Sequence, residues 1–230
     1  MRVLRLQLYQ EFACYRKPLT FNFWETYPLP PLSTVKGLFH SVLRAKEYIP
    51  AKYSIQGSFE SLFLDMQTMN KFTRKGASAD GIYIEEYGKD FTKSIAYVAN
   101  LYAVNLTIYI ASDMRYLEKF RENLLIYEYL SLGRKEDLVR VDSVDFVELA
   151  ERNLFEDEYL LKNGIYFSKE KARELKVSGI NYRMRFYYEI EDGIRYFDRK
   201  DVVYVSSGVL KQGSILYDKE GDKVVDLIGD

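Results

Sequence analysis

Three prolines directly before an amphipathic run constrain the fold of this chain more than any other feature. Pro28, Pro30 and Pro31 each hold φ at about −65° and keep the preceding residue extended, so the segment enters the next element in one direction. Ser33 or Thr34 can then cap a helix by accepting from the amides of its first turn. Apolar residues with helical spacing follow at Val35, Leu38, Phe39, Val42 and Leu43. The sequence therefore predicts a helix that packs one side against a core.

The opposite side of this helix carries a basic stripe, because Lys36, His40 and Arg44 recur every four residues. Gly37 lies among them, although a glycine inside a helix costs about 1 kcal/mol relative to alanine. We therefore expect something to approach the helix backbone closely at Gly37. Free amides at a helix N-terminus and a basic stripe together suit phosphate, so a polyanion is one candidate. The alternative is an ordinary amphipathic helix with a solvated polar side.

Composition narrows the class of protein. The 230 residues include 33 Lys and Arg against 34 Asp and Glu, so any nucleic-acid binding depends on local basic patches and not on net charge. The single cysteine, Cys14, excludes an internal disulfide, and no apolar run reaches the roughly 20 residues of a membrane helix. The first residues favour a strand over a signal peptide, so we expect a cytoplasmic protein without a membrane association. No metal-ligand or phosphate-loop spacing occurs, and we expect no metal and no cofactor.

Periodicity predicts an α+β fold. In the first strand, Leu4, Leu6 and Leu8 alternate with polar groups such as Arg5, which should face outward from the sheet. The proline-led helix follows, then strands at 53–66, where Gly57 suggests a bulge, and at 98–110, a helix at 114–124, and a strand at 138–149. This order predicts a ferredoxin-like domain over residues 1–150, the plan that the RNA recognition motif shares. Residues 151–230 should form a linker and a small β-rich meander.

An insertion at about residues 67–95 separates the second and third predicted strands and is far longer than a hairpin loop. It mixes cations with aromatic residues, as at Lys71, Phe72, Arg74 and Lys75. Such a mixture suits a single strand of nucleic acid, because cations meet phosphates and rings stack on bases. A disordered or partner-covered loop with ordinary charges is the alternative.

Four motifs in order resemble the CRISPR-associated Cas-five family of the RAMP superfamily, and most nearly its type I-B branch. They are ACYRKP at 13–18, ETYPLPPLSTVKGLFHSVLRA at 25–45, YSIQGSFES at 53–61 and YLSLGRKEDLV at 129–139. The resemblance implies a non-catalytic subunit of a type I Cascade surveillance complex, acting in antiviral defence. Such a subunit binds the 5′ handle of the CRISPR RNA (crRNA) and caps the Cas-seven backbone. The insertion corresponds to the family's β-hairpin thumb, which contacts Cas-seven.

The resemblance also implies partners and a second RNA contact. A Cas-eight-type large subunit would dock at the same end of the assembly, and the chain would meet target DNA indirectly through the complex. The turn at 131–134 corresponds to the family's glycine-rich loop, where Gly133 lets backbone amides approach RNA and Arg134 adds a cation. Nothing in the spacing of Arg183 and Arg185 places them on the same surface as the other candidate RNA-binding residues.

Together these motifs give one set of candidate RNA-binding residues. They are Arg16, Lys17, Ser33, Thr34, Lys36, Gly37, His40, Arg44, Gly133 and Arg134. We expect no enzymatic activity, but one branch of the family cleaves precursor crRNA without metal. His40, Lys36 and Tyr27 are the residues that could do so here, since general acid-base catalysis needs only one well-placed imidazole. A protein-only adaptor without RNA contact is a third hypothesis, favoured by the near-zero net charge.

Overall fold

The computed structural model describes residues 1–76, 81–155 and 158–230, so residues 77–80 of the predicted insertion and 156–157 of the predicted linker lie outside the described part. Six elements follow the predicted order of strand, helix, strand, strand, helix, strand. They are β1 (Arg2–Ala13), α1 (Leu32–Leu43), β3 (Lys52–Ser58), β6 (Lys89–Ala111), α2 (Met114–Leu125) and β7 (Arg140–Asn153). The four strands lie side by side and antiparallel in the order β3-β6-β1-β7. The predicted α+β class is confirmed.

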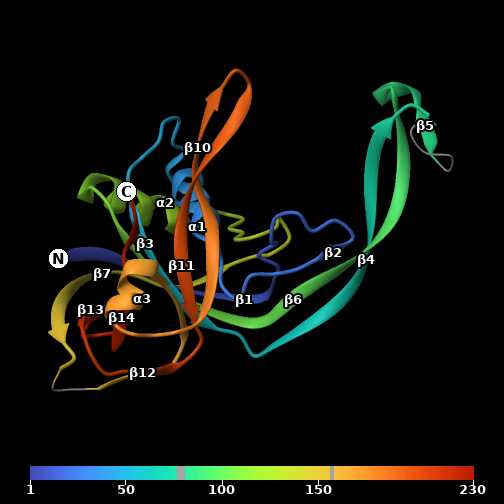
Figure 1. The fold of residues 1–230 in the computed structure, drawn as a ribbon. Coiled ribbons are helices and arrows are strands. Elements are labelled where there is room, and N and C mark those ends of the chain that lie inside the picture. Colours follow the sequence, from blue (N-terminus) through green and yellow to red (C-terminus); the bar gives the residue numbers. More distant parts are fainter. Residues whose placement is uncertain (77–80, 156–157) are drawn as a thin grey trace.

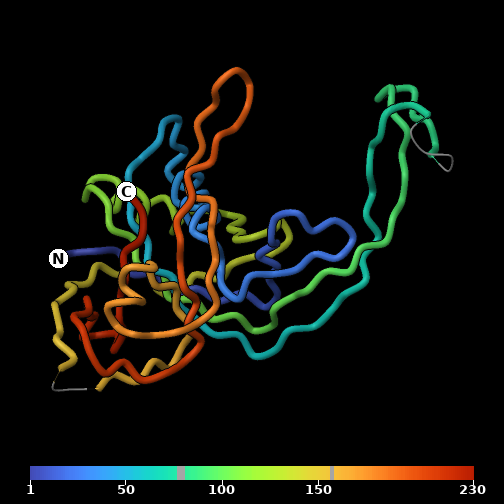
Figure 2. The backbone as a smooth tube through the Cα atoms, viewed as in Figure 1, coloured from blue at the N-terminus to red at the C-terminus, as the bar shows by residue number. Residues whose placement is uncertain are grey.

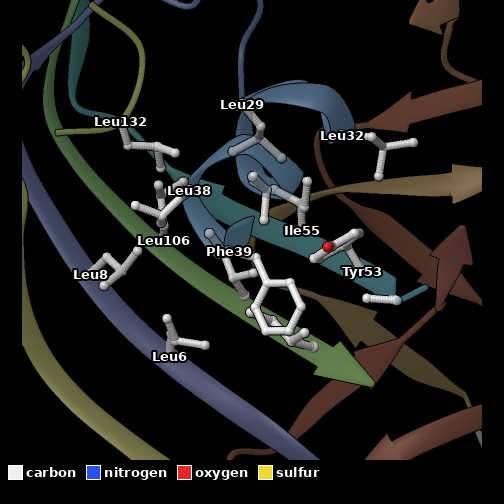
Figure 3. Close-up of a cluster of buried hydrophobic side chains, with 14 of the residues drawn as sticks. Leu6, Leu8, Leu29, Leu32, Leu38, Phe39, Tyr53, Ile55, Leu106 and Leu132 are labelled. Carbon is white, nitrogen blue, oxygen red and sulfur yellow. The ribbon is translucent and has the colours of Figure 1, made fainter. Parts of the chain in front are cut away.

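The main core lies between this sheet and the two helices (Figures 1 and 3). Leu6 of β1 is opposite Ile108 of β6 and Val144 of β7, and all three side chains are buried. From α1, Phe39 is fully buried, with its ring centroid 5.1 Å from that of Phe120 in α2. The apolar stripe predicted for α1 therefore packs against the sheet and against α2.

The start of α1 differs from the prediction. The helix begins at Leu32, and Pro31 is its N-cap with φ −67° and ψ 155°. Proline suits this position because its φ matches the helix entry, and the Pro31 carbonyl accepts from the Thr34 amide at 2.9 Å. Ser33 and Thr34 consequently lie inside the first turn, and no side chain caps the helix. The prediction that Ser33 or Thr34 is the N-cap is wrong.

The insertion forms a long two-stranded arm that extends away from the rest of the molecule (Figures 1 and 2). β4 (Ser61–Arg74) pairs with the first part of β6, from Ser61 opposite Tyr102 to Arg74 opposite Lys89. A short strand, β5 (Ile82–Ile84), and a 3-10 helix (Glu85–Tyr87) lie near its tip. The strand predicted at 53–66 is thus two strands, β3 and β4, and both pair with β6.

Gly57 is not at a bulge, because β3 pairs with β6 without a register shift around it. A Cβ at this position would instead collide with the carbonyl oxygen of Asn105 on β6. Gly57 also pairs with Gly164 on its other side, so two strands approach it closely. The glycine is needed here for close strand packing.

The C-terminal residues extend the same sheet at both edges. β9 (Gly164–Ser168) joins β3, and β11 (Ile194–Val205) and β10 (Ile180–Glu191) continue outward from it. β13 (Ser214–Asp218) pairs with β7, and β14 (Lys223–Val225) pairs with β13. The remaining elements are β2 (Phe23–Trp24), β8 (Tyr159–Leu161), α3 (Lys169–Glu174), β12 (Gly208–Leu210) and β15 (Ile228–Gly229). The domain boundary expected near residue 150 falls inside β7. The C-terminal strands pair with strands of the first sheet and do not form a separate sheet.

The outer face of β1 is covered, although its polar residues were expected to lie open. Arg5 is buried, and its guanidinium donates to Asp218 of β13 at 2.9 Å. Val3, Tyr109 and Val225 are also buried on this side, in a second core between the sheet and the C-terminal strands. Within the described residues, no helix has both the length and the apolar character needed to cross a bilayer.

Candidate nucleic-acid interface

A basic groove of about 480 Å³ opens at the N-terminus of α1. Ser33 and Thr34 of the first helical turn line it, and this turn holds no acidic residue and no side-chain cap. The positive end of the helix dipole is therefore not neutralised locally. The groove is also lined by five cationic side chains: Arg16, Lys17, Arg183, Arg185 and Arg199. Cations converging on a helix N-terminus are an arrangement that suits phosphate.

Arg16 and Lys17 reach the groove because the chain after β1 folds back on itself. Arg16 pairs with Thr26 in an isolated antiparallel bridge, and the Lys17 amide donates to Glu25 at 2.8 Å. The Arg16 guanidinium lies 3.9 Å from the centroid of the Trp24 ring, which orients it. Lys17 forms an ion pair with Glu25 at 3.0 Å, so part of its charge is balanced within the protein.

The hairpin of β10 and β11 supplies Arg183, Arg185 and Arg199. The spacing of the first two in the sequence did not place them on this surface. Alternation in β10 buries Met184 and exposes Arg183 and Arg185 on the opposite side. β11 then places Arg199 opposite Arg185. The period of two around Met184 was a signal for their shared direction. Their position beside α1 depends on strand pairing far from them in sequence.

The groove continues along α1 over Gly37. A second segment of about 330 Å³ is lined by Thr34, Gly37 and Ser41 from α1, and by Tyr127 and Tyr129 from the chain after α2. A Cβ at Gly37 would meet no atom within 4 Å, so the close approach expected there does not come from this chain. Instead, the helix surface at Gly37 is open to the groove.

A third segment of about 870 Å³ follows, bordered by the same two tyrosines and by Arg44 and Lys119. Arg44 is exposed and lies at the C-cap of α1 with φ 50°. The three segments share lining residues, Thr34 between the first two and Tyr127 and Tyr129 between the last two. The three segments lie one after another beside α1, and we call them together the α1 groove. Ser41 of α1 and Tyr127 form a hydrogen bond of 3.2 Å where the second and third segments meet.

Lys36 does not line this groove. Its ammonium nitrogen lies 4.9 to 5.3 Å from the ring centroids of Tyr48, Phe186 and Tyr187. Burial among these rings lowers the pKa of Lys36 below its ordinary value. The side chain thus connects α1 to β10 through cation–π contacts. This position makes it part of the packing and not an open phosphate contact.

His40 is likewise a packing residue. Its Nδ1 lies 2.9 Å from the Lys36 carbonyl, and its Nε2 accepts from the Ile49 amide at 3.0 Å. A carbonyl partner requires a proton on Nδ1, so this arrangement fits the neutral ring, and burial lowers the pKa of His40. Tyr27 lines the basic groove, where Lys36 and His40 do not. The three residues of the nuclease alternative are therefore not brought together around one cavity.

The predicted glycine-rich loop is held by a buried carboxylate. Asp137 accepts from the Arg134 guanidinium at 2.7 Å and from the Cys14 amide at 3.0 Å, and Arg134 also donates to Asn100 at 2.8 Å. Gly133 has φ 113°, and a Cβ there would lie 2.7 Å from an Asp137 oxygen. Arg134 therefore shapes this loop from within, with its guanidinium directed to protein partners. The loop borders the α1 groove at Gly133.

The thumb residues lie on the arm and are exposed. Phe72 is 52% exposed and packs its ring 5.4 Å from that of Tyr87, while Lys75 lies 4.3 Å from the ring centroid of Tyr83. Lys71 and Arg74 are also exposed. Lys71 also lines a cavity of about 370 Å³ that it shares with Arg16 and Trp24, next to the basic groove.

Closer to the body, the arm carries an apolar face that was not predicted from the sequence. Its exposed members are Leu62, Leu64, Met66, Ile95 and Tyr97. Met66 is directly opposite Tyr97, so the two strands present these side chains on one side. Alternation from Leu62 to Met66 was the available signal. Among the residues that the structure describes, no group of three or more His, Cys, Asp or Glu side chains is placed to hold a metal ion.

One protein family matches most of the chain. The family described as "CRISPR-associated protein (Cas_Cas5)" matches residues 3–197. A chain of a "CRISPR RNA-guided surveillance complex" has a TM-score of 0.58 and 13% identity, covering 89% of this chain and 90% of that chain. A CRISPR protein from Archaeoglobus fulgidus has a TM-score of 0.48 and 11% identity, covering 100% of both chains. Among curated protein sequences, none matches the chain.

The family match extends over most of the chain, including β1, α1, the arm, α2, β7 and the hairpin that bears Arg183 and Arg185. The first solved structure shares the fold over nearly the same extent. The chain therefore belongs to the CRISPR-associated protein (Cas_Cas5) family, the Cas-five family that its four motifs resemble.

Proposed function

We propose that this protein is a non-catalytic subunit of a type I Cascade complex, most nearly type I-B, that holds the 5′ handle of crRNA in the α1 groove. The observation that carries the proposal is the convergence of five cations on the uncapped N-terminus of α1. Phosphate contacts there would position the RNA without reading its sequence. Membership of the Cas-five family and the antiparallel order β3-β6-β1-β7, which fits a ferredoxin-like domain, support this role.

The middle of the α1 groove suits the bases of a single strand. Gly37 leaves the helix backbone accessible, and Tyr129, which is 78% exposed, offers a ring across the groove. Stacking on such a ring holds an unpaired base. With a net charge of −1, binding depends on this local arrangement, and neighbouring subunits would share the polyanion.

The arm would cap the Cas-seven backbone. Exposed apolar faces of this kind are typical of protein contacts, and Leu62, Leu64 and Met66 are all more than half exposed. The family resemblance supplies the identity of the partners: a Cas-seven subunit at the arm, a Cas-eight-type subunit at the same end, and target DNA through the assembled complex.

Three substitutions test the groove. The variant Arg16→Ala/Arg183→Ala/Arg185→Ala should retain less crRNA in the purified complex. The slope of log binding constant against log salt concentration should become shallower by about 2. A matched control removes three exposed cations elsewhere, Lys162→Ala, Lys211→Ala and Arg140→Ala, and should retain crRNA as the wild type does. Unchanged RNA occupancy in the groove variant, with the subunits still assembled, would favour the protein-only adaptor.

The nuclease alternative has its own test. Both ring nitrogens of His40 have protein partners, which supports a non-catalytic role. The isolated protein should therefore leave repeat RNA intact in EDTA. Specific cleavage that disappears in His40→Ala would replace the proposal with metal-independent processing of precursor crRNA.

A further inference from the structure

The hairpin of β10 and β11 rises from the body beyond the α1 groove (Figure 1). Four side chains along it form a row in which two neighbouring rings lie between two cations. The Arg185 guanidinium lies 4.3 Å from the Phe197 ring centroid, the Phe197 and Tyr188 centroids are 5.7 Å apart, and the Arg195 guanidinium lies 4.8 Å from the Tyr188 centroid. We call Arg185, Phe197, Tyr188 and Arg195 the hairpin ladder.

The hairpin separates its charges by face. A register shift between Arg185 and Tyr187 brings Tyr188 opposite Phe197 and Ile190 opposite Arg195, on the side of Arg185. Of the carboxylates near the tip, Glu189, Glu191 and Asp198 occupy alternate positions and point to the other side, while Asp192 lies in the turn itself. Nearer the body, Asp201 shares the ladder side and pairs with Arg183 at 3.8 Å. The ladder side is therefore cationic and aromatic toward the tip.

The ladder is accessible and its cations are available. Tyr188 is 41% exposed, Arg185 and Arg195 are exposed, and Phe197 is half-buried. Across residues 1–76, 81–155 and 158–230, neither guanidinium forms an ion pair with a carboxylate, and each lies over a ring instead. An incoming anion would thus meet two cations that no neighbouring carboxylate neutralises.

The ladder is continuous with the α1 groove, because Arg185 lines that groove and is also the first member of the ladder. We propose that the hairpin ladder binds single-stranded nucleic acid that leaves the α1 groove, with phosphates at Arg185 and Arg195 and one unpaired base stacked on each ring. This inference rests on the proposed function of the groove. Stacking of this kind accepts any base, so the ladder extends binding without adding sequence preference.

A length series of RNA tests the ladder. The probes are fluorescein-labelled oligouridylates of about four and about twelve nucleotides, which span the range of single-strand site sizes. The variant Tyr188→Ala/Phe197→Ala of the full chain should bind the longer probe about tenfold more weakly and the shorter probe as the wild type does. Arg195→Gln keeps both rings and should lower the affinity for the longer probe and the salt dependence of its binding.

The same hairpin supplies a matched control. Ile194→Ala/Tyr196→Ala removes similarly exposed side chains from the opposite face, 57% and 54% exposed, and should bind both probes like the wild type. Thermal unfolding establishes that each variant is folded. If the ladder variant binds the longer probe with wild-type affinity, the inference is overturned and the groove proposal stands. If the wild type binds neither probe, both fail.

One further outcome would assign the ladder to a protein partner. If the Tyr188→Ala/Phe197→Ala variant keeps its RNA affinity but no longer co-purifies with the other subunits of its complex, the surface is a protein interface, and the inference is overturned.

Discussion

Arg5 and Asp218 form a buried ion pair across 213 positions of the sequence, with 2.9 Å between the guanidinium and carboxylate atoms. Tyr109 donates to the same carboxylate oxygen at 2.8 Å. The three groups join β1 and β6 to the end of β13. They hold the C-terminal strands against the sheet, so the face of β1 that bears Arg5 is covered.

Asp218→Asn should destabilise the protein by about 3 kcal/mol, because it removes the buried carboxylate of Arg5 and leaves only the more exposed Asp145 and Glu220, at 3.5 and 3.9 Å. Urea unfolding at neutral pH measures the change. Glu158→Gln is the matched control, since it removes one partner of the exposed pair with Lys211 and should change stability by less than about 0.5 kcal/mol. Equal losses in both variants would contradict a special role for the buried pair.

Stability should fall between neutral and mildly acidic pH because of His40, the only histidine of the chain. Burial lowers the pKa of His40 in the folded protein, whereas the unfolded chain takes up the proton near the ordinary value of about 6.5. Below that value the unfolded state binds more protons, so the free energy of unfolding decreases by up to about 1.4 kcal/mol per pH unit until the folded pKa is reached.

Urea unfolding across this pH range, with His40→Gln beside the wild type, checks the prediction. Glutamine cannot titrate, but its carbonyl can still accept from the Ile49 amide that His40 binds. The variant should lose the pH dependence in this window. The same slope in both proteins would show that another group is responsible.

Gly37 allows stability and RNA binding to be changed in opposite directions. Gly37→Ala should stabilise the fold by about 1 kcal/mol, since the site lies inside α1 with free space around it. Gly37→Leu, with its larger side chain, should narrow the α1 groove and weaken crRNA binding. Unfolding curves and fluorescence anisotropy with handle RNA measure the two effects.

The control for Gly37 is the other groove glycine. Gly133→Ala should destabilise the protein, because φ is 113° and Asp137 occupies the space of the new methyl group. If Gly37→Leu is folded and binds RNA with wild-type affinity, the RNA path does not pass over Gly37.

Shortening the arm should remove partner binding and spare the fold. Met69 and Ser94 are opposite each other, so an Asn-Gly turn in place of residues 70–93 closes the hairpin there. None of the described residues of this segment, 70–76 and 81–93, belongs to the main core, and the thermal midpoint should change little. Binding to a Cas-seven subunit, measured by co-purification, should be lost.

A second arm variant separates length from surface chemistry. Leu64→Ser/Met66→Ser keeps the full arm but makes its apolar face polar, and it should also weaken this binding. Full assembly of the shortened chain would remove the arm from the proposed interface.

Local periodicity accounts for the parts of the fold that the sequence predicted well. Alternation in β1 and helical spacing in α1 identified Leu6 and Phe39 as core residues, since each lies on the only apolar side of its element. Arg16 was singled out by its charge and Gly37 as a glycine inside a helix, and both line the α1 groove.

Side chains on the polar sides were predicted less well, because a polar side does not identify its neighbours. Lys36, His40 and Arg44 share the basic stripe, but β10 packs over Lys36 and the segment after α1 covers His40 through Tyr48 and Ile49. Arg44 is left exposed. Arg134 matches the family's glycine-rich loop, yet a carboxylate three residues later, Asp137, takes up its guanidinium. That spacing was a local signal for the ion pair.

By itself, the sequence determined the class of fold, the order of its elements, the long insertion and the family. Only the tertiary structure decided which cations share a surface, since Arg183, Arg185 and Arg199 meet Arg16 and Lys17 through the pairing of β9 with β3 and of β11 with β9. The physical reason is the distance along the sequence over which each effect acts. Backbone periodicity sets the direction of a side chain within its own element, whereas its neighbours are set by strand pairing between distant segments, which local spacing does not encode.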